Sequence, residues 1–275
     1  MYGLLKRLDD AAFLGFRIWE FSFRSLRRRY SLTFLARILL RHPANAIAGV
    51  SKYRRLVRAN LEQSDITMLF EGPEDDLVSR LATARRDLLV AVGFCQKPMG
   101  APGVGCPAGR FNHDCRVLAR DDVLEVQAGR LPIACRGCGV RVIGTAALRA
   151  GAVVYIMTSA ADIARHLFIP TLEGGRFRHG LFLQCPYSIP AMILPLLICH
   201  IQSLLVGYGE GDCRDYAQFL LADGGTKGER TYLNPTAHAH VLDFLQDVAS
   251  ARRARGRHYR RFHRDGFLHV PAIET

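Results

Sequence analysis

The sequence predicts an α/β fold: a doubly wound, mostly parallel sheet of about four strands, with helical N- and C-terminal extensions. Two observations support this prediction. Four short apolar runs recur along the middle of the chain, and helix-like segments separate them. Runs that are apolar throughout, rather than alternating, are typical of strands buried on both faces of a parallel sheet. Strands that alternate with helices favour this class over an all-helical or all-β architecture.

Length and charge suggest how the chain is organised. It has 275 residues, which fits one large domain with appendages, and a formal net charge of +12. The charge is uneven: residues 1–61 carry +10, residues 62–251 carry −3 and residues 252–275 carry +5. We therefore expect a basic amphipathic helical segment over 1–61, a cysteine-rich α/β metal-binding domain over 62–234, and a C-terminal helix with a basic tail over 235–275.

The N-terminal segment combines basic and aromatic residues. Over residues 1–30 apolar side chains recur near helical spacing, and Arg27, Arg28 and Arg29 close the pattern. Such a helix suits an anionic membrane surface or an acidic partner protein, and nucleic acid less well. Packing against the domain or a second subunit explains the same pattern. Charges interrupt every window of ~20 residues, so no membrane-spanning helix is expected here. The first apolar run also lacks the form of a secretory signal, which predicts a cytoplasmic protein, with docking at the membrane periphery.

Local signals place the other elements. A helical connector is expected over 51–88, with a helix that begins at Glu74 because acidic residues fill its first turn. Gly151 should end a helix, Ser159 should cap the next one, and Pro170 should end it. Strands are predicted over 88–94, 152–157, 181–184 and 202–208, and further helices over 140–149, 160–168, 189–198, 214–221 and 237–254.

Seven of the eight cysteines are candidate metal ligands. Clustered cysteines in a reducing compartment more often bind metal or perform redox chemistry than form structural disulfides. Three of them follow predicted strands, and the carboxyl ends of parallel strands share one edge of a sheet. A CxxC pair precedes a helix, whose N–H groups stabilise thiolate. Cys199 lies in an apolar run and is predicted to be a buried core residue. The candidate ligands are Cys95, Cys106, Cys115, Cys135, Cys138, Cys185 and Cys213.

The cysteine pattern favours an iron–sulfur cluster, most simply [4Fe–4S], over zinc. Structural zinc is commonly held by two CxxC-like knuckles, and this chain has one CxxC. Scattered loop cysteines around a single CxxC fit a cluster better. Seven thiols exceed what one cluster needs, so the others would serve a second metal site or redox and sulfur chemistry. His113 and Asp114 are expected to be a polar pair on the surface of a loop.

Three functional hypotheses follow from this pattern. The first is a cysteine-ligated iron–sulfur protein in redox or sulfur-related metabolism. The second is a zinc-stabilised binding module for nucleic acid or a partner protein, which the net charge alone supports. The third is a metal-free thiol enzyme that uses a cysteine of lowered pKa. No catalytic residue, substrate or reaction is assigned.

The order of these motifs over about residues 85–215 resembles a cysteine-rich prokaryotic family, catalogued as domain of unknown function one hundred and sixteen. The likeness rests on a strand that ends in Cys95-Gln96, the element Cys135-Arg136-Gly137-Cys138-Gly139, and a glycine followed by a strand at 151–156. It extends to a strand that ends in Cys185-Pro186 and a turn at Gly211-Asp212-Cys213. The resemblance implies a metal- or cluster-binding protein. Cys199 is an extra cysteine in this pattern, and the basic ends lie outside it.

Overall fold

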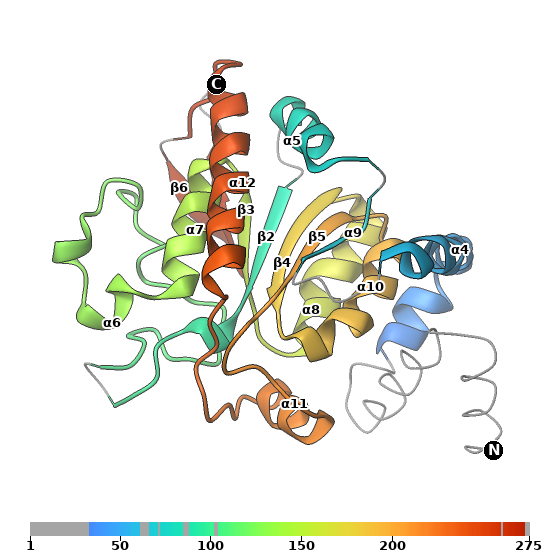
Figure 1. The fold of residues 1–275 in the computed structure, drawn as a ribbon, viewed down its shortest axis with the longest axis horizontal. Helices are drawn as coiled ribbons and strands as arrows, with labels where there is room; N and C mark the ends of the chain where they lie inside the picture. Colours follow the sequence, from blue (N-terminus) through green and yellow to red (C-terminus); the bar gives the residue numbers. More distant parts are fainter. Residues whose placement is uncertain are drawn as a thin grey trace.

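The computed structural model describes residues 33–60, 66–70, 72–84, 88–101, 104–259 and 261–272. These residues form a mixed sheet with helices on both faces (Figure 1). The α/β class that the sequence predicts is therefore correct. The predicted aromatic helix at residues 1–30 lies outside the described residues.

The sheet has seven strands in the order β1-β5-β4-β2-β3-β7-β6. Its centre is parallel: β4 pairs with β5 on one side and with β2 on the other, and β2 pairs with β3. The outer strands are antiparallel, with β1 against β5, β7 against β3, and β6 against β7. The strand bounds are β1 (Ile66–Met68), β2 (Leu88–Gly93), β3 (Val153–Met157), β4 (His179–Gln184), β5 (Gln202–Gly207), β6 (Phe262–Asp265) and β7 (Leu268–Pro271).

The prediction of about four mostly parallel strands is wrong in extent. The four predicted strands are present as β2, β3, β4 and β5, but three antiparallel strands flank them. Strand β1 is only three residues long and lies where a helical connector was expected. Strands β6 and β7 form a hairpin in the predicted basic tail, joined through Gly266 at φ +57°. The preceding Asp265 makes an Asp-Gly pair, a hairpin signal that the basic composition obscured.

Both faces of the central sheet are buried. Along β2, Leu88, Val90 and Val92 pack with one hydrophobic cluster, whereas Leu89 and Ala91 pack with the other. This alternation explains the unbroken apolar run, because side chains on successive residues point to opposite faces. Helices α5, α7 and α12 cover the first face, and α4, α10 and the α8–α9 segment cover the second (Figure 1).

The helices largely follow the predicted pattern. Ser159 caps α8, because its side chain accepts a hydrogen bond from the Asp162 N–H, as predicted. Pro170 does not end this segment: it lies in the first turn of α9, where a missing N–H costs little, and the chain stays helical to Gly174. The bounds are η2 (Phe34–Leu39, a π-helix), α4 (Pro43–Asn60), α5 (Glu74–Thr83), α6 (Ile133–Arg136), α7 (Gly139–Arg149), α8 (Ala160–Ile163), η5 (Ala164–Phe168, a π-helix), α9 (Ile169–Gly174), α10 (Ile189–Ile198), α11 (Tyr216–Asp223) and α12 (Pro235–Arg253).

The end of α12 is fixed by a buried arginine. Arg252 is fully buried, and its guanidinium donates hydrogen bonds to backbone carbonyls at the ends of two other helices. Nε donates to Leu81 (2.9 Å) and Nη2 to Ala84 (3.2 Å), while Nη1 donates to Ala150 and Gly151 (2.9 Å each). One side chain thus satisfies carbonyls that the helix ends leave without intrahelical donors.

In the part of the chain that the structure describes, no helix is long and apolar enough to cross a membrane. Of the basic segment at residues 1–61, helix α4 is described, and it packs against α10. That part of the segment therefore covers the domain itself.

Candidate metal centre and thiol cavity

The long connection from β2 to α7 carries four of the candidate ligands. Cys106 and Cys115 lie on its irregular part, Cys135 lies in α6, and Cys138 is the N-cap residue of α7. Electrostatic interactions link Cys106 to each of the other three thiols, and Cys138 to Cys115 and Cys135. Cys106 is half-buried and the others are buried. We call these four residues the loop cysteines.

Backbone N–H groups approach two of the loop cysteine sulfurs. Cys115 accepts from Val117 and Leu118, and Cys138 accepts from Val140 and Arg141 in the first turn of α7. These donors lower the thiol pKa, but burial outweighs them: it raises the pKa of Cys138 and raises that of Cys115 to about 11. N–H groups that point at sulfur are a feature of metal-thiolate sites, because they stabilise charge on the sulfur.

A buried lysine lies beside the loop cysteines. Lys97 is 1% exposed, and its ammonium donates to Asn112 O (2.9 Å), Asn112 Oδ1 (2.6 Å) and Gly109 O (3.2 Å). Burial lowers the Lys97 pKa, while negative charge on Cys106 and Cys115 raises it. A buried ammonium that is held by carbonyls on one side and faces thiols on the other favours thiolates there.

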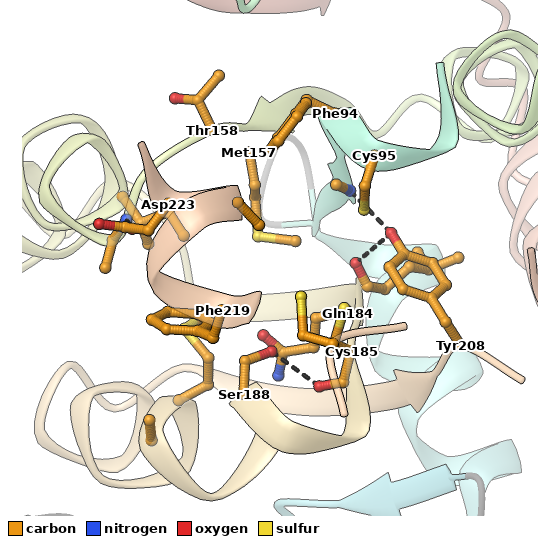
Figure 2. Close-up of a pocket in the computed structure, with 18 of the residues that line it drawn as sticks. Phe94, Cys95, Met157, Thr158, Gln184, Cys185, Ser188, Tyr208, Phe219 and Asp223 are labelled. Atoms are coloured by element: carbon orange, nitrogen blue, oxygen red, sulfur yellow. Dashed lines mark hydrogen bonds between the residues drawn. The ribbon is translucent and has the colours of Figure 1, made fainter. Parts of the chain in front are cut away.

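The other three candidate ligands line a cavity at the carboxyl edge of the sheet. Cys95 follows β2, Cys185 follows β4, and Cys213 lies beyond β5, so strands far apart in sequence bring them together. The cavity measures about 760 Å³ including its open mouth, and its wall is mainly apolar. Figure 2 shows Cys95, Cys185 and Tyr208 on one side of it and Asp223 on the other. We call these three residues the cavity cysteines.

The cavity cysteines form a chain of thiol hydrogen bonds. The Cys185 thiol donates to Cys95, which lowers the Cys95 pKa despite burial, and Thr231 and the charge of Lys227 act in the same sense. Cys185 accepts a hydrogen bond from the Cys213 thiol, which lowers the Cys185 pKa. Its own hydrogen bond to Cys95 and its burial have the opposite effect, and together they raise the Cys185 pKa to about 12. The Lys227 ammonium lies 3.4 Å from Cys213 Sγ. Cys95 is thus the cavity thiol most readily ionised.

Gln96 and Arg230 connect the two groups of cysteines. Arg230 donates to the Gln96 carbonyl (3.0 Å) and to the Gly137 carbonyl inside the CxxC (2.5 Å). A Cβ atom on Gly139 would clash with Gln96 Oε1, so a larger residue there would have to displace the end of the Gln96 side chain. The glycine after the CxxC therefore leaves room for the buried Gln96 side chain where the segment after β2 meets the start of α7.

Cys199 lies apart from both groups. It packs in the hydrophobic cluster on the opposite face of the sheet, and its thiol donates to the Phe168 carbonyl (3.7 Å). Burial raises its pKa well above the ordinary value. This environment is that of a core cysteine, as the apolar run around it predicts.

Sequence reasoning missed the charged residues around these thiols. Lys97, Lys227 and Arg230 come from loops, and no spacing in the sequence ties them to a cysteine. Only the position of Lys97, two residues after the cysteine that ends β2, offered a signal. His113 was expected to pair with Asp114 on a loop surface, but it is half-buried and its Nδ1 lies 2.7 Å from the Ile156 carbonyl. Asp114 forms an ion pair with Arg264 instead.

The hydrogen bond from Cys185 should control the reactivity of Cys95. We expect Cys185→Ala to raise the Cys95 pKa, because it removes the largest influence that lowers it. At a pH below the pKa, each unit by which the Cys95 pKa rises cuts the fraction of thiolate roughly tenfold. The thiolate that remains is about threefold more nucleophilic, because nucleophilicity rises with pKa. Alkylation of Cys95 should therefore slow roughly threefold for each unit of pKa. Iodoacetamide labelling of the Cys95 peptide, followed by mass spectrometry against pH, measures this effect.

The matched control for this measurement is Cys199→Ala, which removes a buried thiol from the other face of the sheet. It should leave the Cys95 labelling profile unchanged. The interpretation is wrong if Cys185→Ala leaves the midpoint of that profile where it is, or moves it to lower pH.

No family model, curated protein or solved structure matches this chain. The family resemblance that the cysteine motifs suggest therefore stays a prediction from those motifs.

Proposed function

We propose that this protein is a cysteine-ligated metalloprotein, and that the loop cysteines Cys106, Cys115, Cys135 and Cys138 hold its metal. The observation that carries the proposal is the shared environment of these thiols. Electrostatic interactions link Cys106 and Cys138 to each other and to the other two thiols, N–H groups donate to two sulfurs, and the buried ammonium of Lys97 lies nearby. Four thiols complete the ligand set of a [4Fe–4S] cluster or of a zinc site made of four cysteines.

The described sulfurs are not spaced as in a closed zinc site. Among the described cysteines, no three sulfur atoms lie within 4.8 Å of one another. A tetrahedral zinc ion with Zn–S bonds of about 2.3 Å would draw its sulfurs to about 3.8 Å from one another. A cluster is a larger cage whose ligands stand farther apart, so we propose a cluster rather than zinc for the loop cysteines. Cys95, Cys185 and Cys213, which were also predicted as ligands, would then remain free for a second metal or for thiol chemistry.

A bound cluster would supply one-electron redox chemistry. The protein would hold it in a buried site, and the N–H groups and Lys97 would offset the negative charge of its thiolates. Thiols must lose their protons to bind metal, and burial raises the pKa of Cys115, Cys135 and Cys138. Acid should therefore release the metal, since protons compete for the same sulfur atoms.

Anaerobic purification followed by absorption and elemental analysis tests the proposal. A brown protein that absorbs broadly near ~400 nm and contains iron with acid-labile sulfide is the expected result. Colourless protein with stoichiometric zinc would overturn the cluster and favour the zinc-stabilised binding module. Protein that carries neither metal would contradict metal binding by the loop cysteines.

The cavity cysteines support a second candidate function, a thiol enzyme that needs no metal. Cys95 has a lowered pKa and lines a largely apolar cavity with Lys227 close by, an environment that activates a nucleophilic cysteine. Both functions fit one chain, because the loop cysteines and the cavity cysteines are separate groups.

We also propose that this protein is cytoplasmic and that its basic segment at residues 1–61 docks it on an anionic membrane surface or an acidic partner. Each Lys or Arg near an anionic bilayer contributes about 1 kcal/mol. We expect the protein to sediment with phosphatidylserine vesicles but not with phosphatidylcholine vesicles, and high salt should reverse this only in part because aromatic residues also insert. Absence of sedimentation with anionic vesicles contradicts membrane docking. If the protein instead binds nucleic acid, and high salt removes that binding completely, the segment would be a site for nucleic-acid phosphates.

A further inference from the structure

Two histidines and an aspartate meet at the carboxyl end of β3, outside both groups of cysteines. One ligand atom from each of His113, Asp162 and His166 lies within 4.8 Å of the other two. Among the described residues no other set of three histidine, cysteine or acidic side chains meets so closely. Asp162 and His166 are four residues apart on the helical segment after β3, so they share one face of it. His113 reaches them from the loop that carries the cysteines.

Each of the three side chains is oriented by a second partner. His113 Nδ1 lies 2.7 Å from the Ile156 carbonyl, and His166 Nδ1 lies 3.2 Å from the Tyr155 hydroxyl. The Nε2 atom of each ring would then be the ligand atom, and a bound ion would replace the long 3.4 Å contact of His113 Nε2 with the Thr158 hydroxyl. The Oδ2 atom of Asp162 accepts hydrogen bonds from Thr158 (2.7 Å) and Ser159 (2.8 Å). Histidine ligands in metal sites are held in this way by a bond to the other ring nitrogen, and ligating carboxylates are likewise hydrogen-bonded.

The backbone and the aromatic shell around the three residues also point to a built site. His166 lies in the π-helix η5, a distortion that often marks functional positions in helices. Phe267 stacks on the His166 ring with 3.9 Å between centroids, and Tyr155 stacks on the His113 ring at 5.2 Å. These aromatic rings limit the rotation of both imidazoles.

We infer that His113, Asp162 and His166 bind a divalent first-row transition-metal ion. Two imidazoles and one carboxylate suit zinc, cobalt or iron(II), whereas calcium and magnesium prefer all-oxygen sites. Three protein ligands leave coordination positions open, as in catalytic rather than structural sites. Thr158, which bonds Asp162 and lines the thiol cavity, places the ion next to that cavity. The inference is independent of the metal at the loop cysteines, because no ligand is shared.

Cobalt(II) binding to the purified full-length protein tests the inference. Equilibrium dialysis should find one more Co²⁺ per chain in the unmodified protein than in His113→Ala. Asp162→Asn should lower the affinity for this additional Co²⁺ ion at least roughly tenfold. The change removes the charge of the ligand but keeps an oxygen that accepts from Thr158 and Ser159. The additional equivalent should lack the strong near-ultraviolet absorption of cobalt bound to thiolate. The matched control is His258→Ala, which changes a histidine far along the chain from the site and should bind cobalt like the unmodified protein.

Equal cobalt content in the unmodified protein and His113→Ala would overturn the inference, and so would thiolate absorption from the additional equivalent. X-ray absorption at the cobalt edge of the unmodified protein gives an answer even if the variants do not fold. Scattering from imidazole is expected there, and a shell of sulfur alone would contradict the site. These outcomes are distinct from failure of the cysteine site, which would show as loss of iron and sulfide.

Discussion

Cys135→Ser or Cys138→Ser should abolish metal retention at the loop cysteines. Serine is nearly isosteric with cysteine, but its hydroxyl stays protonated and is a poor ligand for iron or zinc. The change removes one ligand from the CxxC at the start of α7, and the three remaining thiols cannot complete the site. We expect the content of iron and acid-labile sulfide after gel filtration to fall from stoichiometric to a small residue, measured by elemental analysis together with absorption near ~400 nm.

Cys199→Ala is the control for loss of a buried thiol as such. It should retain full metal and cost about 1–2 kcal/mol of stability through lost packing. If both CxxC variants keep their full metal content, the loop cysteines do not form the site. Loss of metal in Cys199→Ala alone would point to general destabilisation instead.

Arg252→Met should destabilise the fold by about 3–5 kcal/mol. Methionine keeps much of the length and the apolar stem, but it cannot donate to the carbonyls of Leu81, Ala150 and Gly151. The Ala84 carbonyl, the fourth acceptor, keeps a donor in Arg257. A buried carbonyl left without a donor costs about 1–3 kcal/mol, and water entering the space would recover part of that sum. Urea unfolding followed by circular dichroism measures the change as a lower midpoint with a similar slope.

Arg253→Met provides the matched control, because the adjacent arginine is exposed and bonds only its neighbour Ser250 among the contacts described. It should change stability by less than about 0.5 kcal/mol. A loss below about 1 kcal/mol in Arg252→Met would mean that water replaces the guanidinium at these carbonyls without penalty.

Elements whose signal lies within a few consecutive residues could be predicted from the sequence. The four central strands were recognisable because each is a short apolar run buried on both faces, and Ser159 was recognisable as a cap because N-capping depends on one side chain and the next turn. Strand β1 was not recognisable, since three residues carry no period and their pairing with β5 is a tertiary contact. The helical segment after Ser159 continues past Pro170, because Pro170 lies in the first turn of α9, where its missing N–H costs little. The start of α9 at this point depends on the π-helix η5 before it, which local sequence does not reveal.

The candidate site was predictable in part for the same reason. The rule that parallel strands end at one edge brings Cys95, Cys185 and Cys213 toward one place, and the structure places them around one cavity. Their separation from the loop cysteines was not predictable, because it depends on the path of an irregular connection. The burial of Lys97 and the meeting of His113 with Asp162 likewise depend on that path, which follows no hydrophobic period.

The strand order β5-β4-β2-β3 has a consequence for how the cavity arises. The chain leaves β2 toward α7 on one face of the sheet, and it leaves the neighbouring β4 toward α10 on the other. Adjacent connections that diverge in this way leave a gap at a topological switch point, so the cavity is produced by the winding of the chain rather than by small side chains. The Tyr208 hydroxyl, which accepts from the Gly93 N–H (2.9 Å) and donates to the Leu183 carbonyl (2.7 Å), bridges the two strands at this point. Loops that follow β2 and β4 can therefore change in length and composition, and so alter what the gap accepts, while the sheet beneath keeps its register.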